Sequence, residues 1–151
     1  MFTKKLFVAL LSGLAGPLFL VSPAYAGYGL YASCRFDAND PAYGFIQHGG
    51  SSGYGIYAGI SLTCSEGETV AMQGRLQQLI GGTWYTQVTG PRTPGTGYQT
   101  LGGSGTPATI TGYVDTLGLT CYNGTWRSWN LVNINGTQHN AYSANVSITS
   151  C

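Results

Sequence analysis

The side chains that could carry out acid–base or nucleophilic chemistry are scarce in this sequence. It contains two histidines, His48 and His139, in a chain of 151 residues. Ser51, His48 and Asp37 supply the residue types of a Ser/His/Asp arrangement, but loop serines and histidines are common without such a role. The sequence therefore identifies no catalytic residue and favours a protein that is not an enzyme. A small hydrolase is an alternative.

The carboxylate side chains also lack the spacing of a catalytic pair or a metal site. They are Glu66 and Glu68 between two expected strands, Asp115 at an expected turn, and Asp37 and Asp40 in a short cluster. Acids in such places usually cap turns. The cluster is rich in oxygen, but it lacks the glycine and the distal glutamate of a calcium-binding loop. We therefore predict neither a metal nor a cofactor.

Charged residues are rare throughout the chain and nearly balanced. Lys and Arg total 6 and Asp and Glu total 5, which makes 7% of the residues, against about 25% in an average soluble protein. A nucleic-acid binder needs a footprint of Lys and Arg, so nucleic acid is excluded as a partner. The 43% of hydrophobic residues suffices for the core of one domain.

The first 26 residues have the three parts of a secretory signal peptide. Lys4 and Lys5 precede an uncharged apolar run, and Ala24-Tyr25-Ala26 supplies the small residues of a cleavage site. The run of about sixteen residues is short for a membrane anchor. We expect cleavage after Ala26 and one secreted domain over 27–151 with no stable membrane span, extracellular or, if the source has an outer membrane, periplasmic. Its four arginines and five acids give a side-chain charge of 4 − 5 = −1.

Four cysteines follow the predicted cleavage site, which indicates two disulfides in an oxidising compartment. They are Cys34, Cys64, Cys121 and Cys151, and no Cys-x-x-Cys motif occurs among them. Of the three possible pairings we favour Cys34–Cys64 and Cys121–Cys151. Each of these pairs brackets strands that can return beside their start.

Hydrophobic periodicity predicts strands along the whole chain. Residues 56–64 alternate strictly between apolar and polar or small, and residues 30–36 do the same. Further strands are expected over 70–80, 84–88, 109–114, 117–122, 125–134 and 142–148, with a long Gly-rich loop over 90–107. Gly81-Gly82 and Asn135-Gly136 are hairpin turn signals. The expected fold is an all-β, two-sheet sandwich of seven to nine strands, with a small antiparallel barrel as the alternative.

Three segments carry a resemblance to a known class of proteins. LQQLIGGTWYTQV over 76–88, CYNGTWRSWNLVNI over 121–134 and the terminal VSITSC are similar to segments of small exported proteins, mostly from actinobacteria. Members of that class resemble immunoglobulin-like sandwiches. The resemblance implies an immunoglobulin-like antiparallel sandwich and export. Most of the class has no assigned activity, so it implies no functional residues.

Aromatic residues are the most informative candidates for a binding surface. Tyr and Trp combine apolar area with a hydrogen-bonding tip and are favoured at recognition surfaces. Tyr57 lies opposite the buried parity of its strand and should be exposed, and with Tyr43 and Tyr54 it is predicted to form a binding patch. Trp126 and Trp129 have opposite parity, so one belongs to the core and the other lies nearer solvent.

These observations favour an exported, non-enzymatic binding or structural module. Its uncharged surface of Tyr and Gly would contact an extracellular protein or glycan. A secreted effector, such as an antimicrobial protein or a protease inhibitor with Arg92 as its bait residue, is a second alternative. Asn123, Asn135 and Asn145 each begin an Asn-x-Ser/Thr sequon, which matters only in a cell that glycosylates such sites.

Overall fold

The computed structural model describes residues 28–48, 50–92 and 99–151. The predicted signal peptide and its cleavage site lie outside these ranges. The described residues form eleven strands and no helix: β1 (Tyr28–Tyr31), β2 (Cys34–Ala38), β3 (Ala42–His48), β4 (Ser51–Cys64), β5 (Glu68–Ile80), β6 (Thr83–Arg92), β7 (Gln99–Leu101), β8 (Ala108–Asp115), β9 (Gly124–Ile134), β10 (Thr137–Tyr142) and β11 (Val146–Ile148). A helix able to cross a bilayer is accordingly not found in the described ranges.

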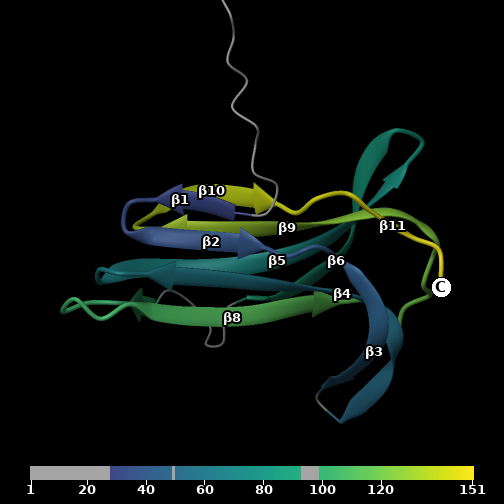
Figure 1. Cartoon of the computed structure of the whole chain (residues 1–151), viewed down its shortest axis with the longest axis horizontal. Coiled ribbons are helices and arrows are strands. Elements are labelled where there is room, and N and C mark those ends of the chain that lie inside the picture. The colour runs from purple at the N-terminus through teal and green to yellow at the C-terminus, as the bar shows by residue number, and fades with distance from the viewer. Residues whose placement is uncertain (1–27, 49, 93–98) are drawn as a thin grey trace, which may run out of the picture.

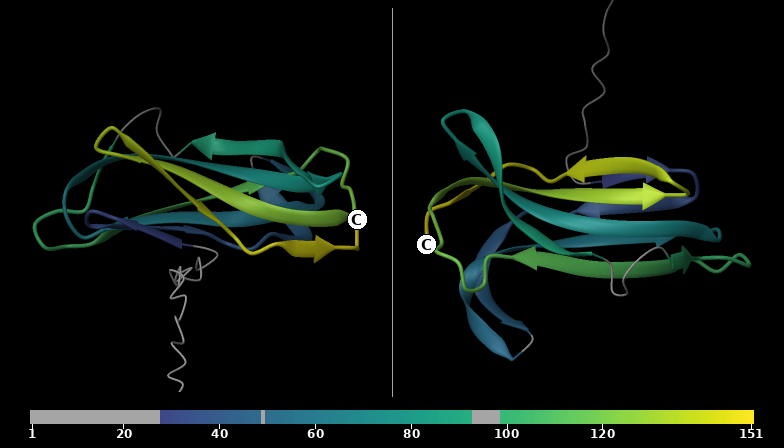
Figure 2. Two further views of the ribbon diagram at one scale, coloured as in Figure 1. Left: turned by 90° about the horizontal axis from the view of Figure 1, so that it is seen from above. Right: turned by 180° about the vertical axis from the view of Figure 1, so that it is seen from behind.

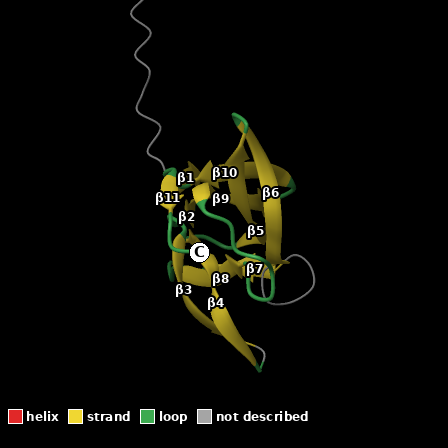
Figure 3. Ribbon diagram, turned by 90° about the vertical axis from the view of Figure 1, so that its right-hand side faces the viewer, coloured by secondary structure: helices red, strands yellow, loops and turns green. Residues whose placement is uncertain are grey.

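The strands form two antiparallel sheets that pack face to face (Figures 1 and 3). Sheet A has the order β1-β2-β4-β3, with β8 on the second edge of β4. Sheet B has the order β10-β9-β5-β6, with β11 also pairing with β9 and β7 with β5. Seen from the end, β2 and β3 lie on one side and β5 and β6 on the other (Figure 3). The structure confirms an all-β, sandwich-like fold. Its sheets are open, so the alternative prediction of a small antiparallel barrel is wrong.

Several strand boundaries differ from the predictions because local turns interrupt the alternation. Eleven strands replace the expected seven to nine. Residues 30–36 form a hairpin, because Ala32 has a φ of 50° and the chain reverses between β1 and β2. The expected strand over 142–148 is divided between β10 and β11, and the expected loop over 90–107 contains the end of β6 and all of β7.

Residues 117–122 are the clearest error, since they form no strand. The Asp115 carboxylate accepts a hydrogen bond from the Leu117 amide at 2.8 Å, and the Leu119 amide donates to the Thr116 carbonyl at 2.9 Å. Gly118 has a φ of 80°, which glycine adopts without steric cost. These contacts close a turn directly after β8.

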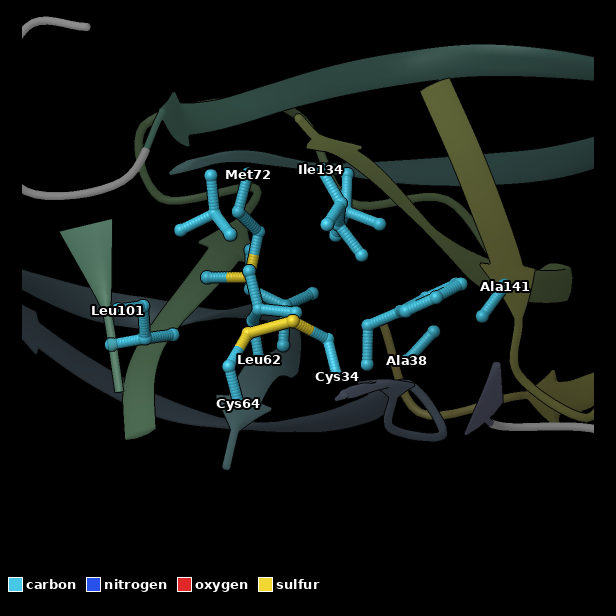
Figure 4. Packing of buried hydrophobic residues seen from close by; sticks show 12 residues of the cluster. Cys34, Ala38, Leu62, Cys64, Met72, Leu101, Ile134 and Ala141 are labelled. Carbon is cyan, nitrogen blue, oxygen red and sulfur yellow. A yellow bond between two sulfur atoms is a disulfide. The ribbon is translucent and has the colours of Figure 1, made fainter. Parts of the chain in front are cut away.

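Inward-facing residues of β2, β4, β5 and β9 form the core in two clusters. The first surrounds the Cys34–Cys64 disulfide (Figure 4) and includes Phe36, Leu62 and Met72. The second contains Trp126, whose exposed fraction is 2%, together with buried apolar residues of β4, β5, β8 and β11: Ile56, Ala58, Leu76, Val114 and Ile148. Trp129 lies half-buried on the outer face of β9, so the predicted division of the two tryptophans is confirmed.

Both predicted disulfide pairings are present. Cys34 and Cys64 are direct register partners in β2 and β4, with Cα atoms 4.0 Å apart. Cys121 and Cys151 join the segment before β9 to the end of the chain, with Cα atoms 5.4 Å apart, and the Cys151 amide donates to the Asn123 side-chain oxygen. Two such bonds are consistent with an oxidising environment.

A buried polar seam joins the sheets at the link between β2 and β3. Ser128 of β9 donates its hydroxyl hydrogen to the Asn39 carbonyl at 2.6 Å, and the Asn130 amide donates to the Asp37 carbonyl at 3.1 Å. Both side chains are fully buried. The first bond satisfies a carbonyl of the β2–β3 link and the second a carbonyl near the end of β2, where an unmade hydrogen bond would be costly. The seam therefore defines where β3 leaves the sandwich.

One end of the sandwich is held by the Glu68 carboxylate. It accepts hydrogen bonds from the Asn135 side-chain amide and from the Ser33 hydroxyl, the latter at 2.8 Å. These bonds, chiefly the one from Asn135, hold the pKa of Glu68 below its ordinary value. Asn135 lies in the Asn-Gly turn between β9 and β10, at a φ of 51°. The carboxylate thus connects the β1–β2 turn to the β9–β10 turn.

The lowered pKa of Glu68 predicts a loss of stability in acid. Because the folded-state pKa is depressed, the ionised carboxylate stabilises the fold above its ordinary pKa of about 4.3, and this contribution disappears as the pH falls through the folded value. We expect Glu68→Gln to be less stable than the wild type at pH 7 and the gap to narrow towards pH 3. Urea unfolding of both proteins at pH 7 and pH 3 measures this difference in stability. Ser33→Ala, which removes one donor, should reduce the pH dependence in part, whereas parallel pH profiles of wild type and Glu68→Gln would contradict the assignment.

Candidate binding site

Residues 42–48 and 50–57 form a hairpin that projects from the sandwich, and we call it the projecting hairpin. It comprises β3 and the first part of β4, in register from Ala42↔Tyr57 to His48↔Ser51. On the other edge of β4, β8 begins to pair only at Tyr57. Beyond Tyr57 the hairpin therefore consists of two strands, and it curves away from the body of the sandwich (Figure 1; Figure 2, right).

Three aromatic rings lie on one face of the projecting hairpin, and we call them the ring array. Tyr43 and Tyr54 stack with their centroids 6.0 Å apart, and Phe45 meets Tyr54 edge-on at 5.5 Å. Phe45 and Tyr54 are direct register partners, and 58% and 66% of their surfaces are exposed. Tyr43 packs against the second core cluster, which supports the base of the array. The array is thus an exposed aromatic surface continuous with the core.

Tyr57 lies on the opposite face of the hairpin, so the predicted patch of three tyrosines does not form. Register partners share a face, which groups Tyr54 with Phe45 and Tyr57 with Ala42. The Tyr57 ring covers Gly44, where an added Cβ would come within 3.2 Å of it. Tyr57 is 39% exposed, as its parity predicted, but it belongs to the outer face of sheet A.

The turn after β8 covers the second face of the hairpin. The Thr116 hydroxyl accepts a hydrogen bond from the Ile56 amide at 2.9 Å, and the Thr116 amide donates to the Ile56 carbonyl. Ile46 is buried beneath this turn, and a Cβ on Gly55 would lie 2.9 Å from both Ile46 and Thr116. These contacts leave the ring array as the exposed aromatic face of the hairpin.

The projecting hairpin carries no Asp, Glu, Lys or Arg. The nearest such residues in the sequence are Asp40 and Glu66. Removing an aromatic surface from water is favourable, and here no charged group of the hairpin has to be desolvated with it. The ring array therefore suits contact with an uncharged surface.

The structure keeps the candidate catalytic residues apart. Ser51 and His48 are register partners at the tip of the hairpin, whereas Asp37 pairs with Ser61, ten residues further along β4. Asp37 forms an ion pair with Arg35 at 3.1 Å. Residues 49–53 also read Gly-x-Ser-x-Gly, but a nucleophile elbow places its serine between a strand and a helix, whereas Ser51 begins strand β4.

The other candidate residues have structural partners. His139 packs on Tyr31, with ring centroids 3.8 Å apart, where β10 lies beside β1. The Asp40 carboxylate accepts a hydrogen bond from the Ala144 amide at 2.9 Å. No group of three or more His, Cys, Asp or Glu residues that could hold a metal ion occurs within the ranges described. The backbone of Arg92 ends β6 opposite Gln73, and its side chain lies outside the described atoms.

Sequence reasoning missed a second surface, on the outer face of sheet B. Its members stack in the order Trp84, Arg127, Tyr142, Trp129 and Arg75, and we call this row the arginine–aromatic ladder. The Arg127 guanidinium lies 4.2 Å from the Trp84 ring centroid and 4.4 Å from that of Tyr142. Trp129 stacks on Tyr142 at 5.5 Å, and Arg75 lies 4.7 Å from the Trp129 centroid. Alternation along residues 125–134 could have placed Arg127 and Trp129 on one face.

Glutamine side chains orient both arginines of the ladder. Arg127 donates from Nε to the Gln77 side-chain oxygen at 2.8 Å, and Gln77 in turn donates to Thr86. Arg75 donates from Nε and Nη2 to the Gln73 oxygen. Partial burial lowers the pKa of Arg127, an effect that nearby Tyr142 opposes. Arginine nevertheless stays protonated in proteins, so both ladder arginines are cations.

No protein-family model matches the chain, and no curated protein sequence matches it significantly.

Proposed function

We propose that the protein is an exported, non-enzymatic binding module with an immunoglobulin-like sandwich as its scaffold. The ring array on the projecting hairpin carries the proposal. It combines two largely exposed aromatic residues, Phe45 and Tyr54, with an uncharged hairpin anchored to the core. Two disulfides and the signal-peptide pattern of residues 1–26 support export.

The partner that best fits the array is the uncharged part of a protein surface outside the cell. Exposed apolar surface rimmed by polar residues is typical of protein–protein contact sites. Phe45 has no polar tip with which to bond a sugar hydroxyl, and aromatic side chains form the energetic centres of protein interfaces. Ser51 and Ser52 near the tip, with Gln47, supply polar groups around it.

Substitution of a ring in the array should weaken binding to that partner. The probe is an array of purified extracellular proteins, and each protein that binds is then titrated at low and high salt. We expect Phe45→Ser and Tyr54→Ser each to weaken binding roughly 30-fold, the change that follows when a hot-spot residue is lost. Because the hairpin is uncharged, the affinity should be nearly independent of salt.

Tyr57→Ser provides the matched control, since it removes a tyrosine from the other face of the same hairpin. It should leave the affinity unchanged. Equal losses in Tyr57→Ser and Tyr54→Ser would show that the hairpin's fold, not its ring array, is required. Absence of any binding protein, or binding to neutral glycans alone, would refute the proposed partner class.

A further inference from the structure

The outer face of sheet B carries two arginine side chains. Arg75 and Arg127 lie there on β5 and β9, and their diagonal placement across adjacent strands separates their Cα atoms by about 7–8 Å. The acids lie elsewhere: Asp37 and Asp115 on sheet A, Asp40 in the β2–β3 link, and Glu66 and Glu68 at the β4–β5 end. Neither ladder arginine has an ion-pair partner in the described part of the chain.

Each guanidinium of the ladder is held in place while part of it stays available. The rings of Trp84 and Tyr142 lie close to the Arg127 guanidinium, and Gln77 binds its Nε. Its two terminal nitrogens have no hydrogen-bond acceptor among the described residues, and Nη1 of Arg75 has none either. A planar guanidinium fork with free terminal nitrogens matches the two oxygens of a carboxylate. Because the guanidinium is already held in place before a ligand arrives, binding loses less side-chain conformational entropy.

The groups around the ladder are amides and aromatic edges. Gln138 and Asn140 of β10 are exposed on the same face, as the register partners of Asn133 and Leu131. Amides both donate and accept, so they can bond hydroxyl groups of either orientation. The face thus offers sparse positive charge within a broad hydroxyl-bonding surface.

We propose that the arginine–aromatic ladder binds an acidic glycan, a polysaccharide with carboxylates on its sugar rings. Carboxylates of the chain would pair with Arg127 and Arg75. Its hydroxyls would bond the amides of β10, and its C–H surfaces would contact Tyr142 and the two tryptophans. Nucleic acid would need a denser basic footprint than these two cations provide. This site is separate from the ring array and does not depend on the function proposed for that array.

Calorimetric titration of the purified protein with hexagalacturonate tests the proposal, and the fully methyl-esterified hexasaccharide is the matched ligand control. We expect the free acid to bind and the ester to bind at least about tenfold more weakly, since a hydrogen bond to a charged group is lost. Arg127→Gln and Arg75→Gln should each weaken binding by roughly tenfold or more. Arg127→Lys should also weaken it, because lysine keeps the charge without the planar fork.

Arg35→Gln is the control for charge alone, because Arg35 lies on sheet A in the ion pair with Asp37. Its affinity should stay at the wild-type value, as should that of Tyr54→Ser in the ring array. Equal binding of acid and ester, no binding of the acid, or an equal loss in Arg35→Gln would each overturn the proposal. Binding of poly-glutamate as tight as that of hexagalacturonate would overturn the choice of a glycan. Thermal unfolding of Arg127→Gln and Arg75→Gln checks that both remain folded.

Discussion

Replacing Cys34 and Cys64 together by alanine is expected to lower the free energy of unfolding by about 4–5 kcal/mol. A disulfide that closes a loop of this length restricts the unfolded chain by about 3.5 kcal/mol in the chain-entropy description. Both cysteines are also fully buried in the first core cluster. Alanine leaves the volume of the two sulfur atoms unfilled, which adds roughly 1 kcal/mol.

The second disulfide is a matched control, because both bonds span a sequence separation of 30. Loop entropy therefore predicts the same loss of stability when either disulfide is removed. Any difference between the two losses comes from the surroundings of each disulfide in the folded protein. Cys121 is half-buried and Cys151 is exposed, so their replacement should cost only about 3–3.5 kcal/mol. Chemical unfolding without reductant measures the free energy of unfolding of both double variants. A larger loss for the Cys121–Cys151 pair would contradict the part assigned to core packing.

Trp126→Ala is expected to destabilise the protein by about 3–5 kcal/mol, the usual range for truncating a buried tryptophan. Its side chain lies between the sheets in the second core cluster, and its Nε1 donates to the Tyr122 carbonyl at 3.1 Å. Truncation removes the packing and leaves that carbonyl without this donor. Because Tyr43 contacts the same cluster, the near-ultraviolet circular dichroism of the ring array should change as well.

Trp129→Ala distinguishes a core tryptophan from a surface one. Trp129 is half-buried on the outer face, where it contacts Arg75 and Tyr142. Losing its stacking and cation–π contacts should cost about 1–2 kcal/mol, clearly less than Trp126→Ala. Trp126→Phe should fall between the two, because phenylalanine refills part of the volume but cannot donate to Tyr122. Equal losses for the two alanine variants would refute the division into inner and outer faces.

Local patterns predicted the features that depend on neighbours along the chain. The period of two placed Trp126 and Trp129 on opposite faces and predicted that Tyr57 is exposed. The Gly81-Gly82 and Asn135-Gly136 turns have the positive φ values that such hairpins need. The same period could have separated Tyr54 from Tyr57, because an odd spacing of three places them on opposite faces. The turns at Ala32 and Gly118 were not predicted, because a turn within a run of alternating apolar and polar residues leaves that sequence pattern unchanged.

The ring array and the ladder depend on pairings that are distant in sequence, and so they could not be predicted. The projecting hairpin exists because β8 first pairs with β4 at Tyr57, which leaves residues 42–56 without a full third strand. The ladder needs the strand order β10-β9-β5-β6 to bring Tyr142 and Trp84 to opposite sides of Arg127. Neither the strand order nor the point where β8 begins to pair can be deduced from hydrophobic periodicity.

The polar seam beneath the hairpin has a consequence for how this surface can evolve. Ser128 bonds a main-chain carbonyl of the β2–β3 link and Asn130 one near the end of β2, and no side chain of the hairpin itself takes part in these bonds. Carbonyls are the same whatever residue carries them. Substitutions at the exposed positions of residues 45–54 can therefore accumulate without loss of these bonds, provided that buried Ile46 and the glycines beneath Tyr57 and Thr116 are kept. The sandwich can in this sense keep its fold while the exposed residues of its tip are exchanged.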